Sequence, residues 1–313
     1  MGAAPAAPTL RGARVGAAQW RTVGCDWLLI DGSSLIFRAF YGTRGSPPAA
    51  GARDVNAVRS FLERLARLIV QRRPRRLAVA DDEAWRPDWR VELIPTYKSH
   101  RVAEPVPAGL VPQLPIIHDL LEAIGIDMVG VPEHEAEDVI ATWCKLASGT
   151  IEIASGDRDL FALVEDPRVR VLYPEKSGTT VIDEAEVTRR YEIPGRRYAD
   201  FAILRGDPSD GLPGLRGVGS VSAAGMIRRH GDIAGVLRER RLGEADRAYL
   251  ERAMSVVPPV ADLDIPLPAG RRDAYPADEQ ALRRLAAAHG VGDSCARLLD
   301  AVAKLPAIPA SEE

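Results

Sequence analysis

Acidic residues stand in several short motifs of this chain, and together they have the chemistry of a divalent-metal site. The motifs are Asp31, Asp81-Asp82, EHEAED at 133–138, GDRD at 156–159 and GDPSD at 206–210. Taken singly, each has an ordinary explanation, because acids also cap helices, favour helix N-termini and form turns. If the motifs converge, however, each pair of carboxylates about 4 Å apart costs roughly 4 kcal/mol. Divalent cations relieve that repulsion, and a set of ligands made only of oxygen favours Mg²⁺ or Mn²⁺ over Zn²⁺.

A pair of such ions has a definite use in catalysis. Two divalent cations a few ångströms apart stabilise both the attacking and the leaving oxygen of an in-line phosphoryl displacement. His134 lies beside the acids, and we expect it to be a surface or helix-start residue rather than a ligand. The acidic motifs therefore point to metal-dependent cleavage of phosphate esters.

Basic residues lie apart from the acids. They gather in RLIVQRRPRR at 67–76, YKSHR at 97–101 and IRRHG at 227–231. Segregated charge of this kind is compatible with an acidic metal site beside basic phosphate-binding surfaces. Each basic run also fits a solvated helix face, and the net charge of −3 argues against a generic coat for nucleic acid.

Strand-like segments precede several of the acids and would position them. Apolar runs at 26–30, 76–80, 126–131 and 150–155 alternate with helical patterns at 55–71, 114–126 and 135–147. This alternation is typical of an α/β fold with a parallel sheet. Ligands of open α/β sheets bind beyond the carboxyl ends of the strands. We therefore expect Asp31, Asp81 and Asp157 to meet at one edge of the sheet.

The last third of the chain has a different pattern. Strand signals end near Pro194-Gly195, and helical patterns follow at 197–206, 221–231, 232–241, 245–257 and 278–290. We predict an α/β catalytic domain at 25–195 and a helical DNA-binding region at 196–305, between disordered tails at 1–24 and 306–313. The Pro-rich stretch at 101–115 is a long irregular connection of a kind that is usually functional or mobile.

Composition argues against several other classes of protein. The chain has 313 residues, of which 46% are hydrophobic and 27% charged, as in ordinary soluble globular proteins. No apolar run reaches 18 residues, so we predict no membrane-spanning helix. The first 24 residues lack the apolar segment of a secretory signal. Three widely spaced cysteines in no CxxC pattern indicate a reducing cytoplasm and no zinc site.

Five stretches of the chain resemble the 5′-nuclease family. They are LLIDGSSLIFRAFYG at 28–42, AVADDEAWRPDWRVELIPTYKSHR at 78–101, VPEHEAEDVIATW at 131–143, IASGDRDLFALV at 153–164 and ILRGDPSDGLPGLRGVGSVSAAGMI at 203–227. That family includes the N-terminal exonuclease domain of bacterial DNA polymerase I, phage 5′-exonucleases and flap endonucleases. The resemblance covers roughly residues 26–300. It implies a PIN-like α/β fold, with a mixed, mainly parallel sheet flanked by helices and a C-terminal helix–turn–helix element for duplex DNA.

The family's metal site carries over to acidic positions of this chain. The matching positions are Asp31, Asp81, Glu135, Glu137, Asp138, Asp157, Asp159, Asp207 and Asp210. Asp82 is the alternative to Asp81. The resemblance implies one ion nearer Asp31, Asp81, Glu135 and Glu137 and a second nearer Asp157, Asp159, Asp207 and Asp210, with Mg²⁺ or Mn²⁺ as the cofactor. Glu137 stands where Asp is usual, and its extra methylene could displace a ligand and alter metal preference or rate.

Basic and glycine-rich positions match the family's DNA contacts. Arg38 matches a phosphate-binding arginine, although it could instead cover a helix face. Lys98 and Arg101 match the pair at the base of a helical arch near 95–115, where they stabilise and orient the scissile phosphate; Lys98 could also be simply exposed. The positions of the helix–turn–helix element are Gly217, Gly219, Ser220 and Ser222, with K⁺ as an ion bridging to a DNA phosphate.

The resemblance implies a metal-dependent 5′-3′ exonuclease and 5′-flap endonuclease. Its expected substrates are DNA with 5′ ends or 5′ flaps and RNA–DNA primers, and we expect a cytoplasmic, nucleoid-associated monomer. Since no polymerase region follows, we expect a stand-alone nuclease. The Pro-rich arch lacks strong basic residues, which leaves open whether it threads a single-stranded flap. Two alternatives stay open: a non-catalytic flap- or junction-binding protein with a degenerate site, and an RNA-directed nuclease.

Overall fold

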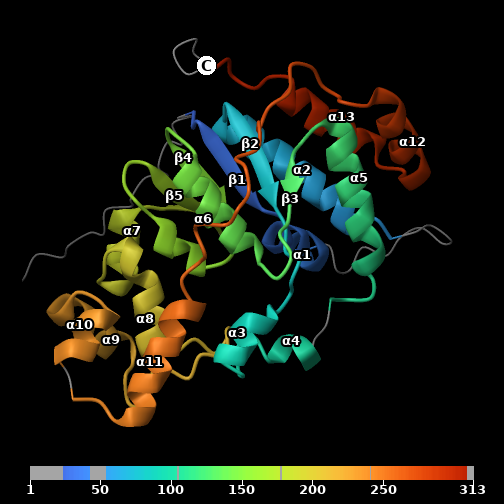
Figure 1. Ribbon diagram of the computed structural model, residues 1–313. Helices are drawn as coiled ribbons and strands as arrows, with labels where there is room; N and C mark the ends of the chain where they lie inside the picture. Colours follow the sequence, from blue (N-terminus) through green and yellow to red (C-terminus); the bar gives the residue numbers. More distant parts are fainter. Residues whose placement is uncertain (1–23, 43–53, 104–105, 177, 240, 309–313) are drawn as a thin grey trace, which may run out of the picture.

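The computed structural model describes residues 24–42, 54–103, 106–176, 178–239 and 241–308. Its central feature is a six-stranded sheet in the order β3-β2-β1-β4-β5-β6 (Figure 1). The strands are β1 (Trp27–Asp31), β2 (Arg76–Ala80), β3 (Met128–Val129), β4 (Ile151–Ala154), β5 (Val169–Glu175) and β6 (Gly178–Ile182). Neighbouring strands are parallel except β5 and β6, which are antiparallel. The predicted mixed, mainly parallel sheet is confirmed.

The central strands coincide with the apolar runs because helices cover both of their faces. Every residue of β1 and β4 is buried, as expected for parallel strands between two helical layers. The β5–β6 hairpin is not among the predicted strands. Arg168 precedes β5, Arg170 interrupts its apolar residues, and β6 lies at the edge of the sheet.

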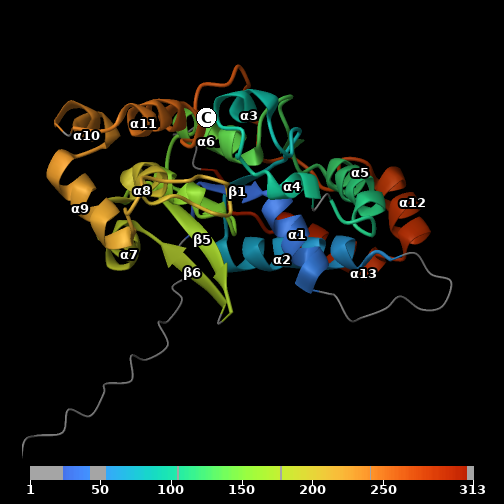
Figure 2. The ribbon, with the colours of Figure 1, turned by 90° about the horizontal axis from the view of Figure 1, so that it is seen from below.

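Successive residues of each central strand enter opposite cores. Leu28 and Ile30 pack with α1 (Gly32–Gly42), α2 (Asn56–Arg72) and α5 (Leu114–Ile124), whereas Leu29 packs with α6 (Ala136–Leu146). Figure 2 shows α1 and α2 on one side of the sheet and α6 on the other. This is the alternation that an extended strand imposes on its side chains.

Two short helices follow β2, before the chain reaches α5. They are α3 (Asp88–Leu93) and α4 (His100–Ala103), and a 3₁₀ turn at Val111–Gln113 leads into α5. The expected arch near 95–115 falls on this connection, of which residues 104–105 lie outside the described residues.

Helices of the C-terminal third occupy two separate places on the α/β core (Figure 1). The first group contains α7 (Glu184–Tyr191), α8 (Tyr198–Arg205), α9 (Ser220–His230), α10 (Ile233–Glu239) and α11 (Glu244–Val256). The chain then returns across the core, and α12 (Glu279–His289) packs on α5 while α13 (Gly292–Val302) packs on α2. Each predicted helical pattern between 197 and 290 corresponds to a helix, and α13 is an additional one. Across the described ranges, no helix has the length and apolar character needed to span a membrane.

Candidate metal centre

A cavity of about 430 Å³ lies beyond the carboxyl ends of the central strands, and acidic side chains line it. Asp31 ends β1, Asp82 follows β2 and Asp157 follows β4. Because the strand order is β2-β1-β4, the three side chains leave neighbouring positions of one edge. The acidic residues lining the cavity are Asp31, Asp82, Glu135, Glu137, Asp157, Asp159, Asp207 and Asp210.

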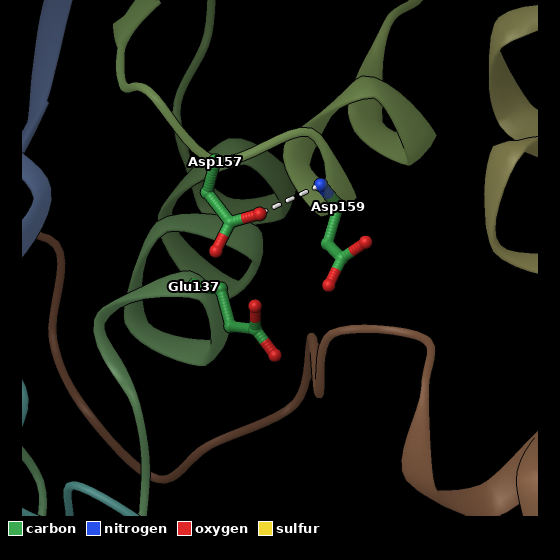
Figure 3. A group of neighbouring side chains, drawn as sticks. All are labelled: Glu137, Asp157 and Asp159. Atoms are coloured by element: carbon green, nitrogen blue, oxygen red, sulfur yellow. Dashed lines mark hydrogen bonds between the residues drawn. The ribbon is translucent and has the colours of Figure 1, made fainter. Parts of the chain in front are cut away.

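Three of these carboxylates lie especially close together. One oxygen from each of Glu137, Asp157 and Asp159 lies within 4.8 Å of the others, and Figure 3 shows the three side chains facing a common space. Glu137 comes from the first turn of α6, whereas Asp157 and Asp159 come from the loop and 3₁₀ turn after β4. The Asp159 backbone N–H donates to Asp157 Oδ1 at 3.0 Å, which fixes the two aspartates relative to one another.

The titration behaviour of this cluster shows an excess of negative charge. Burial raises the pKa of Asp157, and the charge of Asp210 adds to the effect. Burial, Asp210 and Asp157 raise the pKa of Asp159 well above its usual range. Burial also raises the pKa of Glu137 to about 8, even though Lys98 and Arg90 oppose the shift. A divalent cation would relieve this charge, and the all-oxygen donors fit a hard ion.

Glu135 differs from this cluster because cations surround it. Its carboxylate accepts hydrogen bonds from Lys98 Nζ at 2.6 Å, from the Tyr97 hydroxyl at 2.7 Å and from Arg101 at 3.1 Å. Burial alone would raise the pKa of Glu135, but Lys98, Arg90 and Arg101 lower it to about 2. Lys98 is only 2% exposed, and its Nζ also lies 3.9 Å from Asp210. Lys98 and Arg101 also line the cavity.

Arg90 is a central residue of the site that sequence reasoning missed. Its guanidinium is fully buried and forms ion pairs with Glu135, with Glu137 at 2.7 Å and with Asp138 at 2.6 Å. In the sequence, Arg90 stands out as an arginine inside the stretch WRVELIPTYK. Its acidic partners lie far away along the chain, so the sequence does not show that they contact it. Arg90 is the counter-charge that allows three acids of one motif to be buried together.

Asp138, predicted as a metal ligand, lies away from the metal cavity in the structure. Its side chain is fully buried and does not line the cavity. Besides Arg90, it accepts from the Val260 backbone N–H at 2.8 Å and contacts His134 Nδ1 at 3.1 Å. It also completes a capping box with Glu135 at the start of α6. Asp138 therefore anchors the helix, because the helical turn directs it away from the space that Glu137 faces.

The structure also places Asp82, rather than Asp81, at the cavity. Asp81 Oδ2 lies 2.8 Å from His118 Nε2 on α5, and Asp81 does not line the cavity. Asp82 accepts from the backbone N–H of Ala136 at 2.7 Å, and burial and then Glu135 raise its pKa to about 6. Consecutive residues of an extended chain point to opposite faces of the sheet. Only one of the two acids can therefore reach the cavity.

Asp207 and Asp210 reach the cavity on a tight loop between α8 and α9. The Lys98 backbone N–H donates to the Asp210 carbonyl oxygen at 2.9 Å. Gly211 has φ of +68°, and a Cβ atom there would lie 1.8 Å from the Thr96 carbonyl oxygen. Glycine at this position therefore permits the close approach that joins this loop to the segment carrying Lys98.

The other predicted DNA contacts lie outside the metal cavity. Arg38 extends from α1 and donates to the Pro174 carbonyl oxygen at 3.2 Å. The glycine-rich loop leads into α9, where Gly219 is the N-cap residue. The exposed residues at this helix start include Gly217, Gly219, Ser220 and Ser222. Their backbone is therefore accessible to a large ligand at a place separate from the carboxylates.

We predict that the metal-free protein loses stability as pH rises from about 5 to 8. The folded state raises the pKa of Asp82 from 3.8 to about 6, of Asp31 from 3.8 to about 7 and of Glu137 from 4.5 to about 8, mainly through burial. The folded protein therefore holds more protons than the unfolded chain in this range, so stability falls as pH rises. Every tenfold difference in proton affinity between the two states corresponds to about 1.4 kcal/mol. Thermal unfolding in chelator at several pH values measures the effect.

The same titration with a divalent cation serves as the control. Cation binding competes with protons for the carboxylates, so the decline should flatten when excess Mg²⁺ or Mn²⁺ is present. His118 has a raised pKa through its bond to Asp81 and contributes in the same direction, so a His118→Gln variant isolates the cavity's share. A midpoint that rises with pH in chelator would contradict the buried, uncompensated state of the acids.

Known proteins resemble this chain over most of its length. The family described as 5′-3′ exonuclease, N-terminal resolvase-like domain matches residues 26–192. A 5′-3′ exonuclease of Streptomyces coelicolor is 45% identical over 302 residues, covering 87% of this chain and 98% of the relative. A 5′-3′ exonuclease of Mycobacterium tuberculosis is 41% identical over 312 residues, covering 89% and 98%.

A solved structure shows the same fold at lower sequence identity. It is the flap endonuclease of bacteriophage T5, determined as a pseudo-enzyme–product complex with DNA and metal ions. It has a TM-score of 0.61 and 16% identity, covering 89% of this chain and 98% of its own. The family match includes all six strands of the sheet and the lining acids from Asp31 to Asp159. The chain therefore belongs to the 5′-3′ exonuclease family.

Proposed function

We propose that this 5′-3′ exonuclease hydrolyses DNA at 5′ ends and 5′ flaps with two divalent cations, Mg²⁺ or Mn²⁺, in its carboxylate cavity. The observation that carries the proposal is the cluster of Glu137, Asp157 and Asp159, which lies in the same cavity as Lys98 and Arg101. Acidic residues that can hold cations and basic residues that can bind a phosphate therefore line the same cavity. The phage flap endonuclease of the same fold, solved with DNA and metal ions, supports the choice of DNA.

The lining acids come from two parts of the fold. Those on the central strands and at the start of α6 are Asp31, Asp82, Glu135 and Glu137, and those on the loops after β4 and α8 are Asp157, Asp159, Asp207 and Asp210. Glu137 connects the two sets, because one of its oxygens lies within 4.8 Å of oxygens of Asp157 and Asp159. When bound, divalent cations supply Lewis-acid stabilisation of the phosphate oxygens and an activated water for hydrolysis. The protein contributes the geometry, because every one of these acids is held by a strand end, a helix start or a tight loop.

The basic residues would orient the scissile phosphate. Lys98 and Arg101 both contact Glu135, so their charges stay at the cavity when no substrate is bound. Lys98 also adopts φ of +44°, an uncommon backbone conformation of the kind that clusters at functional sites. Arg101 lies over the Trp85 ring at 4.2 Å, which restricts its orientation. Two restrained cations can thus bind a phosphate without first being ordered.

Duplex DNA would bind at a second place, the exposed start of α9. Gly217 has φ of +76°, and the exposed backbone of Gly217, Gly219, Ser220 and Ser222 supports a phosphate contact there, with K⁺ as the bridging ion. RNA–DNA primers fit the same proposal. We further propose that the enzyme acts as a monomer in the cytoplasm at the nucleoid, since this is where a bacterial DNA substrate is found.

Digestion of a labelled 5′-flap duplex tests the proposed function. We expect cleavage with Mg²⁺ or Mn²⁺ and none in chelator, with a faster rate on the DNA flap than on an RNA flap of the same sequence. Activity that survives chelation would refute the metal-dependent mechanism. Tight flap binding without cleavage under any divalent ion would instead identify a binding protein.

Substitution of the two neighbouring aspartates tests the assignment of ligands. We predict that Asp82→Asn lowers kcat/KM roughly 10- to 100-fold, because Asp82 lines the cavity. Asp81→Asn is the matched control, and it should change kcat/KM by less than about threefold because Asp81 contacts His118 instead. Steady-state cleavage of the flap duplex measures both. The reverse order of effects would restore Asp81 as the functional acid.

A further inference from the structure

A second, smaller cavity of about 160 Å³ lies between α1, α2 and the sheet, and three arginines line it. Arg38 comes from α1, and Arg64 and Arg67 come from α2. The remaining lining residues are uncharged: Leu35, Leu68, Gln71, Ala154, Leu172, Pro174 and Thr179. Among the described residues that line it, none is acidic. The cavity therefore gathers three positive charges without an internal counter-charge.

These arginines differ from their neighbours in having few partners. Within the described ranges, Arg64 and Arg67 make no hydrogen bond or ion pair, and Arg38 donates only to the Pro174 carbonyl oxygen. By contrast, Arg72 on the same helix forms an ion pair with Glu152. The basic run at 67–76 is therefore not one surface, because only its first arginine reaches this cavity.

The surroundings of Arg64 disfavour a charged guanidinium that has no anionic partner. Its Nε atom is buried and has no hydrogen-bond partner. Burial, then the charges of Arg38 and Arg67, lower the pKa of Arg64. Glu63, an acid within electrostatic reach of Arg67, is bonded to Arg297 at 2.7 Å and to Ser294. An anion in the cavity would satisfy these groups, and planar guanidinium groups suit phosphate oxygens in particular.

The arginine cavity is a direct neighbour of the metal centre. Ser34 and Gly156 line the metal cavity, and the adjacent Leu35 lines the arginine cavity. A Cβ atom on Gly156 would lie 3.2 Å from Arg38 Cδ, and Gly156 directly precedes Asp157. The two cavities are thus separated by little more than one residue. A nucleic-acid strand with one phosphate at the carboxylates could place another beside the arginines.

We propose that Arg38, Arg64 and Arg67 together bind a backbone phosphodiester of the cleaved DNA strand, next to the scissile phosphate. This inference rests on the proposed function and deepens it. The resemblance to the 5′-nuclease family implies a phosphate contact for Arg38 alone. Arg64 and Arg67 lie three residues apart on one face of α2 and extend that contact into a pocket. The pocket would fix the register of the strand in the metal centre.

Salt dependence of DNA binding tests the proposal. The variant is Arg64→Gln with Arg67→Gln, bound to a labelled 5′-flap duplex in chelator across a range of KCl concentrations. We expect the slope of log K against log[KCl] to fall in magnitude by roughly 1 to 2, because phosphate contacts release counterions. In the cleavage assay, KM should rise roughly tenfold or more while kcat changes by less than about threefold. Arg64→Lys with Arg67→Lys should recover most of the slope.

Matched controls separate this pocket from general charge and from folding defects. Arg283→Gln with Arg284→Gln removes the same charge from exposed positions on α12 and should leave slope and KM as in the wild type. The thermal midpoint of the pocket variant should not fall, since the substitutions remove like-charge repulsion. An unchanged slope in the pocket variant, with normal cleavage by the wild type, would overturn the inference and leave the proposed function intact.

Free inorganic phosphate is the other ligand that the three arginines suit, in place of a DNA phosphate. If inorganic phosphate raises the thermal midpoint of the wild type but not of the pocket variant, while both bind DNA with equal slopes, the pocket takes free phosphate and the proposal is wrong. If the wild type fails to cleave DNA at all, the proposed function fails. The salt slopes of binding then still decide whether the pocket contacts DNA.

Discussion

Asp157→Asn with Asp159→Asn should reduce DNA cleavage about 10³-fold or more. The two carboxylates belong to the closest acidic cluster, and metal ions contribute several kcal/mol to such reactions; about 4 kcal/mol corresponds to a factor of about 10³. Asparagine keeps the acceptor that the Asp159 backbone N–H uses on residue 157, so the local turn should persist. Single-turnover cleavage of a 5′-flap duplex measures the loss.

The same variant should be more stable than the wild type when no metal is present. Burial and the charge of Asp210 raise the pKa values of both aspartates, and neutral side chains at 157 and 159 remove that unfavourable burial of charge and repulsion. Urea unfolding in chelator at pH 8 should therefore show a higher midpoint. Asp300→Asn, an exposed change on α13, is the control for both measurements. Cleavage within tenfold of the wild type would contradict the role of the two aspartates.

Arg90→Met should destabilise the protein by about 3–5 kcal/mol. Methionine fills much of the space but removes the charge that pairs with Glu135, Glu137 and Asp138. Breaking a buried ion pair from one side leaves uncompensated charges and typically costs this much. Urea unfolding at pH 7.5 measures the difference, and Arg283→Met, which removes an exposed pair with Glu279, should cost less than about 1 kcal/mol.

Acid should partly rescue the Arg90→Met protein. Without the guanidinium, Arg90 no longer offsets burial at Glu135 and Glu137, so their pKa values rise and the folded state takes up protons that the unfolded chain does not. The difference in unfolding free energy between the wild type and the Arg90→Met protein should therefore narrow as pH falls toward 5. A gap that is small at pH 7.5, or that widens in acid, would show that Arg90 is not the principal counter-charge.

Sequence patterns suffice for the central strands of the sheet and for the general place of the site. Apolar runs identify β1, β2 and β4 because these strands are buried on both faces, and parallel strands present their following residues at one edge. In the β5–β6 hairpin, Arg170 interrupts the apolar residues of β5 and β6 is mostly small and polar, and α13 begins at Gly292 without a side-chain cap. Neither therefore has a strong local signal. Both are stabilised by tertiary packing, which composition in a short window does not report.

Which acids enter the site depends on the direction of each side chain, and the spacing of residues along the sequence does not determine that direction. Asp81 and Asp82 are adjacent acids after the same strand, and only the exact end of the extended backbone decides which one faces the cavity. Asp138 looks like a ligand in the EAED motif, but the first turn of α6 aims it at Arg90. Arg90 itself lies 45 residues from Glu135 along the chain, so its role becomes visible only in three dimensions.

The packing of α13 on α2 bears on how the protein emerges from the ribosome. Leu298 and Val302 of α13 share one core with Leu65 and Ile69 of α2. At about 5–20 residues per second, α13 is synthesised on the order of ten seconds or more after α2. By the end of that interval the nascent chain has made every carboxylate of the metal centre, yet α2 still lacks the helix that covers it. Completion of the core that supports the metal centre is therefore a late event that awaits the synthesis of α13.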